Sequence, residues 1–338
     1  MNRWAGAVVA LTLAGCGDAA GPPEPALAWE ATQVLLRDQA ITADKVMYRS
    51  DGYRIVGVVC RPLGSGPYPV LMLNHGGWSG LGTELDASVS GCAAVARNGY
   101  VVLESSYRGE DGSEGPIELC AGESRDVRRM LDIVLAQSYA DPTRVSVLGG
   151  SHGGCITYGA MENGLPAQRA VALAGPSDLG ALYDAMADSI AAGVTGDRLS
   201  LFQLFLAEFR RILGGSPEEK PAVYAARSFL PRANAVAAWS GRLMIQHGTD
   251  DDIVPVEQSC ALVKLMGGFE IYHVDDAGAT TPAPPEKCAS FGLTWQGATR
   301  PGQWPGRRYF VVYDGVGHGS GKNADRLNAD TFAFLFTP

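Results

Sequence analysis

The sequence lacks several features that would each point to a class of protein. No two cysteines form a Cys-x-x-Cys pair, no run of lysine and arginine stands out, and no internal repeat is present. A zinc or thiol-redox site is therefore not indicated. With a net charge of −9 and no basic run, the chain has no electrostatic footprint for a nucleic-acid partner. The composition is that of a globular protein, with 46% hydrophobic and 19% charged residues over 338 positions.

The N-terminus also lacks an apolar run long enough to span a bilayer. Its apolar stretch, residues 5–14, is too short for that and follows Arg3, which is the pattern of an export signal. The residues Leu-Ala-Gly-Cys that end at Cys16 resemble the lipobox of bacterial lipoproteins, which implies cleavage before Cys16 and a lipid attached to it. An ordinary secretory signal is the alternative. We therefore expect a signal peptide over 1–15, a flexible tether over 16–30 and a lipid-anchored protein of the periplasm or outer cell envelope.

Six cysteines follow the N-terminal one, and an even number in an exported chain predicts disulfides. Six cysteines allow fifteen sets of pairs, and the sequence leaves the choice among them open. Cys260 with Cys288 and Cys92 with Cys120 are two candidate pairs, each of which would close one loop. Cys155 lies in an apolar helical pattern and is interpreted as a small buried side chain.

Strand-like and helix-like segments alternate from about residue 46. The first two strands, 46–50 and 53–62, flank an Asp-Gly turn, which predicts a hairpin. Helical patterns separate most of the later strands, which predicts right-handed crossovers and a mostly parallel sheet with antiparallel strands at its start. The later strand segments end near residues 77, 109, 150, 175, 248 and 315.

Two segments interrupt this alternation. Residues from about 179 to 238 contain helical patterns and no clear strand, and we expect them to form a helical cap insertion. Residues from about 275 to 307 are rich in proline, glycine and threonine. A loop of that length is uncommon and often functional, although a surface insertion held by Cys288 explains it equally well.

The residues Gly149 to Gly153, with Ser151 at their centre, follow a predicted strand and open a predicted helix. A serine at such a turn projects above the carboxyl edge of the sheet, and small residues two positions before and after it let the neighbouring backbones approach. A phosphate-binding loop is a poor alternative, because Gly154 is followed by Cys155 and not by Lys-Ser or Lys-Thr. A tight turn without chemistry is the other alternative.

A serine nucleophile needs a general base, and the chain has only five histidines. His318 lies on a glycine-flanked loop after the last strand, at the edge where the serine projects. The others suit the role less well: three belong to strands or strand ends (His75, His247 and His273), and His152 is poorly aimed because it directly follows the serine. Elimination and position therefore favour His318 over a solvated loop histidine.

The base needs a carboxylate to orient it. Asp250, Asp251 and Asp252 follow the penultimate strand at the same sheet edge, although three adjacent acids also suit a solvated turn. The chain order serine, aspartate, histidine is that of α/β-hydrolases.

At this point the chain resembles the α/β-hydrolase fold and, within it, the catalytic domain of the prolyl oligopeptidase family. The similar stretches are PYPVLMLNHGG, SSYRGEDGSEG, DPTRVSVLGGSHGG, HGTDDDIVPVEQS and GVGHG. The resemblance implies a mostly parallel central sheet with helices on both faces over residues 31–338. It maps the nucleophile to Ser151, the base to His318, and the acid to Asp251, four residues after the histidine of the HGTxDDxVP motif.

An oxyanion hole must aim donors at the charge that develops on the substrate oxygen. One donor is expected to be the backbone N–H of His152, the residue after the nucleophile. The second is expected from the loop that contains Gly77, with Trp78 as the neighbouring option. Some relatives use a tyrosine hydroxyl at the position of His75, so its side chain is a further candidate.

These residues predict a serine hydrolase that cleaves an acyl ester or amide through an acyl-enzyme, with no metal or organic cofactor implied. Peptidases of the resembled family carry an N-terminal β-propeller, and here fewer than 50 residues precede the first predicted strand. We therefore expect an ester substrate in preference to a short peptide. An exopeptidase is the first alternative, and it would need an acid such as Glu110, Asp111 or Glu114 to hold the substrate amine. A catalytically silent binding scaffold is the second.

Overall fold

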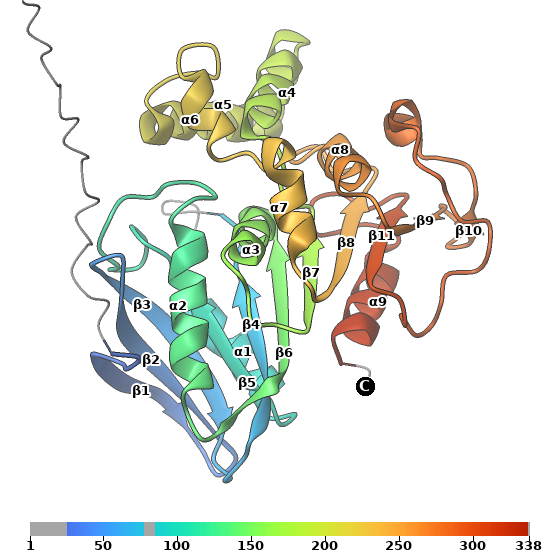
Figure 1. Cartoon of the computed structure of the whole chain (residues 1–338). Coiled ribbons are helices and arrows are strands. Elements are labelled where there is room, and N and C mark those ends of the chain that lie inside the picture. Colours follow the sequence, from blue (N-terminus) through green and yellow to red (C-terminus); the bar gives the residue numbers. More distant parts are fainter. Residues whose placement is uncertain (1–25, 78–84, 337–338) are drawn as a thin grey trace, which may run out of the picture.

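One continuous sheet organises the computed structural model, which describes residues 26–77 and 85–336 (Figure 1). Eleven strands form it in the order β1-β2-β3-β5-β4-β6-β7-β8-β11-β9-β10. The strands are β1 (Ala31–Arg37), β2 (Ile41–Ser50), β3 (Tyr53–Pro62), β4 (Tyr68–Asn74), β5 (Val101–Ser105), β6 (Ala140–Gly150), β7 (Arg169–Leu173), β8 (Arg242–Gly248), β9 (Glu270–Val274), β10 (Thr280–Thr281) and β11 (Arg308–Tyr313). The helices are α1 (Leu85–Ala96), α2 (Glu123–Leu135), α3 (His152–Glu162), α4 (Leu179–Ala191), α5 (Gly196–Leu213), α6 (Pro221–Ala225), α7 (Ala233–Ala238), α8 (Glu257–Met266) and α9 (Ala324–Phe336), with short 3-10 helices η1 (Leu230–Arg232) and η2 (Glu286–Phe291).

The sheet has a parallel centre and antiparallel ends. Strands β1, β2 and β3 pair antiparallel, and β3 pairs antiparallel with β5. From β5 through β9 the pairs are parallel, and β10 closes the far edge antiparallel. The predicted α/β-hydrolase architecture is confirmed. Strand β1 was not predicted, because six of its seven residues are exposed and it lacks the alternating burial that marks a strand in sequence.

Helices cover both faces of the sheet and enclose two apolar cores (Figure 1). Helices α2, α3, α7 and α8 contribute to one core, and α1 and α9 contribute to the other. On α2, the four residues predicted to share one helical face (Val127, Met130, Leu131 and Val134) are all buried. No helix in 26–77 or 85–336 has the length and apolarity needed to cross a membrane.

The two interrupting segments occupy different places. Helices α4, α5 and α6 stand beyond the carboxyl edge of the sheet (Figure 1), whereas α7 returns to pack against α3 and α8. The cap is therefore narrower than the expected 179–238. The segment 275–307 extends from the far edge of the sheet beside β9 and β10.

Three disulfides join the six cysteines of the described chain. The candidate pair Cys260–Cys288 is present, but the other pairs are Cys60–Cys92 and Cys120–Cys155. The candidate Cys92–Cys120 pair is wrong because Cys92 and Cys120 belong to the cores on opposite faces of the sheet. Cys155 is buried, as expected, but it is a disulfide partner and not a free thiol.

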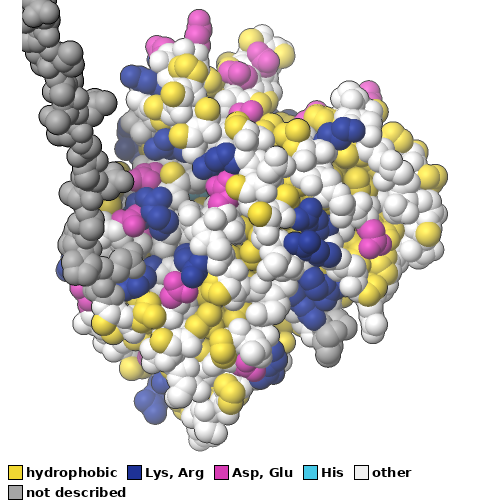
Figure 2. Space-filling model, in the orientation of Figure 1, with side chains coloured by type: hydrophobic (Ala, Val, Ile, Leu, Met, Phe, Trp, Pro, Cys, Tyr) yellow, Lys and Arg dark blue, Asp and Glu magenta, His cyan; other side chains and the backbone are white. Residues whose placement is uncertain are grey.

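Acidic and basic side chains are scattered over the face seen in Figure 2, and a group of basic side chains gathers near α7. Arg307 and Arg308 donate hydrogen bonds to the carbonyls of Trp239 and Ala237 at the end of α7. Cations at a helix C-terminus interact favourably with its dipole, so these arginines stabilise the fold.

Candidate active site

Ser151 lies at a strained turn between β6 and α3. Its backbone has φ of 54° and ψ of −124°, which side-chain-bearing residues rarely adopt. A Cβ on Gly153 would collide with the carbonyl of Asn74, and one on Gly149 would collide with the carbonyl of Gly153. The glycines two positions before and after the serine are therefore required by close backbone packing.

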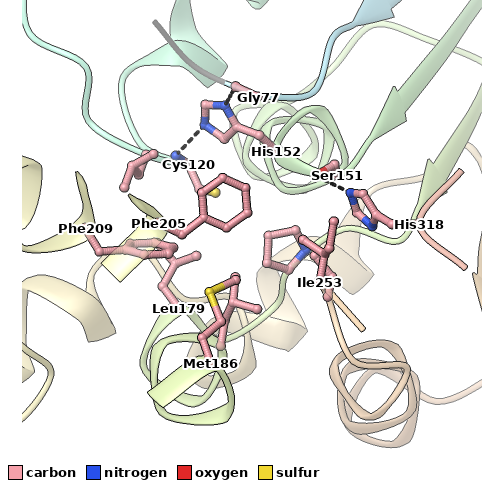
Figure 3. Close-up of a pocket in the computed structure, with 14 residues that line it drawn as sticks. Gly77, Cys120, Ser151, His152, Leu179, Met186, Phe205, Phe209, Ile253 and His318 are labelled. Atoms are coloured by element: carbon pink, nitrogen blue, oxygen red, sulfur yellow. Dashed lines mark hydrogen bonds between the residues drawn. The ribbon is translucent and has the colours of Figure 1, made fainter. Parts of the chain in front are cut away.

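The structure brings together Ser151, His318 and Asp251, as the sequence predicted. His318 Nε2 lies 2.9 Å from Ser151 Oγ, and His318 Nδ1 lies 2.8 Å from Asp251 Oδ2 (Figure 3 draws the first of these bonds). The three residues follow β6, β8 and β11, whose carboxyl ends share one edge of the parallel sheet. Because a carboxylate only accepts, Nδ1–H donates to Asp251, and Nε2 is left to accept the serine proton.

Asp251 is held more firmly than either neighbouring acid. It is 1% exposed, and its Oδ1 accepts hydrogen bonds from the backbone N–H groups of Ile253 at 3.0 Å and Val254 at 2.9 Å. Burial alone would raise the pKa of Asp251, but hydrogen bonds and positive charge from His247 and His318 outweigh it and lower the pKa well below the usual range. Asp251 therefore stays ionised.

Asp250 and Asp252 do not share this environment. Asp250 is exposed and accepts a hydrogen bond from Thr249, and Asp252 forms an ion pair with Arg198. Of the three adjacent acids, only Asp251 contacts His318.

The loop after β4 runs directly past the serine. A Cβ on Gly76 would lie 3.2 Å from Ser151 Cβ, and Gly77 lines the pocket beside the serine with φ of 76°. His152 is the first residue of α3, where backbone N–H groups point out of the helix end. This geometry is suited to the two expected backbone donors, whereas Trp78 lies outside the described residues.

The His75 side chain has a different place from the one expected. Its ring stacks on Tyr107, with centroids 4.0 Å apart and planes 20° apart, and it does not line the pocket. The Tyr107 hydroxyl donates to the His75 carbonyl at 3.0 Å, which keeps the two residues together. The His75 imidazole is therefore not aimed at a substrate oxygen.

A cavity of about 190 Å³ opens beside Ser151 (Figure 3). Its wall is mainly apolar and comes from α4, α5 and the loop after Asp251, through Leu179, Leu182, Met186, Phe205, Phe209 and Ile253. Among its lining residues in the described chain, only His152 and His318 have ionisable side chains. These apolar residues were not predicted as a pocket wall, although the three-, four- and seven-residue spacings of Phe202, Phe205 and Phe209 indicate a buried helical face.

The segment 275–307 contributes nothing to this cavity within the described chain. Its Lys287 donates to the carbonyl of Thr249 at 2.9 Å and lines a separate groove with Asp252 and Met186. Within the described chain this segment therefore lines neighbouring grooves and not the cavity beside Ser151.

One cluster has the composition of a metal site. Ligand atoms of Cys120, His152 and Cys155 lie within 4.8 Å of one another. The two sulfurs form a disulfide, and both nitrogens of His152 form hydrogen bonds to backbone groups. In this state the cluster offers a metal ion neither a thiolate nor an imidazole nitrogen that is free of a hydrogen bond.

Comparison with known proteins defines the class and then the family. The fold matches acetyl xylan esterase 1 from Thermoanaerobacterium sp. JW/SL YS485, with a TM-score of 0.57 and 14% identity over 91% of this chain and 88% of that one. It also matches the Pyrococcus horikoshii acylaminoacyl peptidase, with a TM-score of 0.56 and 16% identity over 87% of this chain and 41% of the peptidase. These likenesses show the α/β-hydrolase fold, and the family match that follows gives the class, which is that of the serine hydrolases.

A match to a family model assigns the chain to a family. The model of the prolyl oligopeptidase family matches residues 87–270, more than half of the sequence, so the chain belongs to the prolyl oligopeptidase family. A relative is the uncharacterized peptidase YtmA of Bacillus subtilis (strain 168), which is 24% identical over 222 residues, covering 65% of this chain and 78% of that protein.

Proposed function

We propose that this serine hydrolase cleaves small esters with an uncharged, apolar acyl group, using Ser151, His318 and Asp251 as its catalytic triad. The observation that carries the proposal is the pair of hydrogen bonds linking Asp251, His318 and Ser151 at the mouth of an apolar cavity.

The proposed reaction follows from the direction of these hydrogen bonds. Ser151 Oγ attacks the acyl carbonyl carbon while His318 Nε2 takes its proton, and Asp251 holds the Nδ1–H tautomer and stabilises the imidazolium. The backbone N–H groups of His152 and Gly77 stabilise the negative charge on the carbonyl oxygen. His318 then protonates the leaving alcohol, and water repeats the sequence on the acyl-enzyme.

The cavity supports a substrate of limited size. A water molecule occupies about 30 Å³ in the liquid and a methylene group is of similar size, so 190 Å³ holds about six such groups. Each buried methylene contributes about 0.8 kcal/mol, or roughly fourfold in kcat/KM. We assign the cavity to the acyl group, because that group stays bonded to Ser151 while the alcohol leaves.

A peptide or amide substrate is the second candidate, since the matched relatives include peptidases by name. An exopeptidase would need an acid in the pocket, and Glu110, Asp111 and Glu114 do not line it. Glu114 instead forms ion pairs with Arg49 and Arg54. An uncharged, N-acylated peptide therefore fits this candidate better than one with a free amine.

Three measurements test the proposal. A fluorophosphonate probe should label the wild-type protein and fail to label Ser151→Ala. p-Nitrophenyl esters from acetyl to decanoyl should give a kcat/KM that rises with chain length and then falls once the cavity is full. N-acyl-aminoacyl p-nitroanilides provide the competing substrates. Rapid turnover of the anilides alone would establish the peptidase, and a folded protein that neither labels nor turns over any substrate would indicate a binding scaffold.

We further propose that the protein is exported and held at the cell envelope by a lipid on Cys16. The signal-like sequence before Cys16 supports this, although it lies outside the described residues, and the three disulfides are typical of an oxidising compartment. Cys16→Ser should release the protein from the membrane fraction and abolish incorporation of labelled palmitate. Unchanged fractionation and labelling would refute the anchor.

A further inference from the structure

Three consecutive carbonyls of the loop after β4 accept hydrogen bonds from three ring side chains. The Tyr107 hydroxyl donates to the carbonyl of His75 at 3.0 Å, and His75 Nδ1 donates to that of Gly76 at 3.1 Å. His152 Nδ1 donates to that of Gly77 at 2.7 Å. The three rings also contact one another, since Tyr107 stacks on His75 and meets the edge of His152 with centroids 5.8 Å apart.

His152 also reaches a second loop. Its Nε2 lies 3.3 Å from the backbone nitrogen of Cys120, which can only donate. A single neutral tautomer with the proton on Nδ1 satisfies both contacts. His152 is 3% exposed, and this burial lowers its pKa to about 4, in keeping with a neutral ring. The disulfide to Cys155, on the same helix as His152, holds Cys120 in place.

The carbonyl contacts matter because of peptide geometry. In a trans peptide the N–H points opposite to the C=O, so a fixed Gly76 carbonyl also fixes the direction of the Gly77 N–H. Glycine has more backbone freedom than any other residue, so Gly77, with its φ of 76°, has little restraint of its own. Contacts to the carbonyls on both sides of its Cα restrain this backbone.

We propose that His152 and Tyr107 are positioning residues for the Gly77 N–H, which they keep pointed at the substrate oxygen. His152 holds the Gly77 carbonyl, and Tyr107 holds His75, whose Nδ1 in turn holds the Gly76 carbonyl. The inference rests on the proposed function, since it assumes that Gly77 is an oxyanion donor for Ser151. The side chain of His152 thus has a role distinct from that of its backbone N–H, which every variant below retains.

Two variants separate the nitrogens of His152. The amide nitrogen of asparagine reaches the position of Nδ1, so His152→Asn keeps the donor to Gly77 and loses the acceptor for Cys120. The amide oxygen of glutamine reaches the position of Nε2, so His152→Gln keeps the Cys120 contact and loses the donor to Gly77. We expect kcat for a p-nitrophenyl ester to fall about 100-fold in His152→Gln with KM nearly unchanged. His152→Asn, which keeps the donor to Gly77, should recover most of that loss.

Tyr107→Phe is the second test, because it removes one hydroxyl from a fully buried ring and keeps its shape. We expect kcat to fall about tenfold. Tyr158→Phe is the matched control: Tyr158 is buried on α3, and its hydroxyl has no hydrogen-bond partner within the described chain, so kcat should not change.

The proposal is overturned if His152→Gln or Tyr107→Phe keeps wild-type kcat. It is also overturned if His152→Gln and His152→Asn show the same loss of kcat and the same loss of Tm, because His152 would then have a purely structural role. If a His152 variant fails to fold, the test is the kcat of Tyr107→Phe compared with that of Tyr158→Phe, and equal values would overturn the proposal. A wild-type protein that neither labels with fluorophosphonate nor hydrolyses any ester would instead reject the proposed function.

Discussion

Replacing Asp251 with asparagine should cost about 10⁴-fold in kcat while leaving the protein folded. The backbone N–H groups of Ile253 and Val254 both donate to Oδ1, so the asparagine must place its oxygen there. Its NH₂ group then occupies the position of Oδ2 and faces His318 Nδ1, which lies 2.8 Å away in the wild type. To avoid two opposed donors, the imidazole must accept at Nδ1 and carry its proton on Nε2, where it can no longer take the proton of Ser151.

The assay is the pH profile of kcat for a p-nitrophenyl ester, with thermal unfolding measured in parallel. Asp250→Asn and Asp252→Asn are matched controls, because Asp250 is exposed and Asp252 loses only a surface ion pair worth at most about 1 kcal/mol. Both should stay within about threefold of wild-type kcat. A folded Asp251→Asn variant that keeps kcat within tenfold of wild type, or a control that loses more than Asp251→Asn, would refute the reasoning.

Three further predictions concern stability and specificity. Burial lowers the pKa values of His75 and His152 to about 4, so between pH 6.5 and 4 the unfolded chain binds protons that the native chain does not. The free energy of unfolding should therefore fall with falling pH by up to about 3 kcal/mol per histidine. Urea unfolding that shows no such loss of stability would contradict this. Replacing both Cys120 and Cys155 with serine removes a disulfide with a sequence separation of 35 and should lower the free energy of unfolding by about 4 kcal/mol. An unchanged urea midpoint would contradict this prediction. Phe205→Ala enlarges the cavity and should move the optimum of kcat/KM to longer acyl chains, whereas an unchanged chain-length profile would place the acyl group elsewhere.

Most of the fold was predictable because its signals are local. The alternation of apolar strands with amphipathic helices indicated a parallel sheet, and the glycines around Ser151 indicated a tight turn between a strand and a helix. Strand β1 was not predicted, because it pairs at an exposed edge of the sheet and buries almost none of its side chains, so its sequence has no alternating apolar pattern.

The disulfide pairs were predictable only in part. Cys260 and Cys288 belong to neighbouring elements, since α8 contacts η2, and proximity along the chain suggested the pair. Cys92 and Cys120 are also close in sequence, but the sheet lies between them. Which face of a sheet a helix covers depends on the handedness and order of the crossovers, which spacing between cysteines does not encode.

The sequence by itself determined the chemical groups of the candidate site and their order: a serine at a strained turn, three acids after a later strand and a histidine after the last one. Only the tertiary structure decided what each imidazole does. The partners of His152 are Gly77, 75 residues away, and Cys120, 32 residues away. The role of an imidazole is set by the group that faces each of its two nitrogens, and here the fold brings those groups from distant parts of the chain.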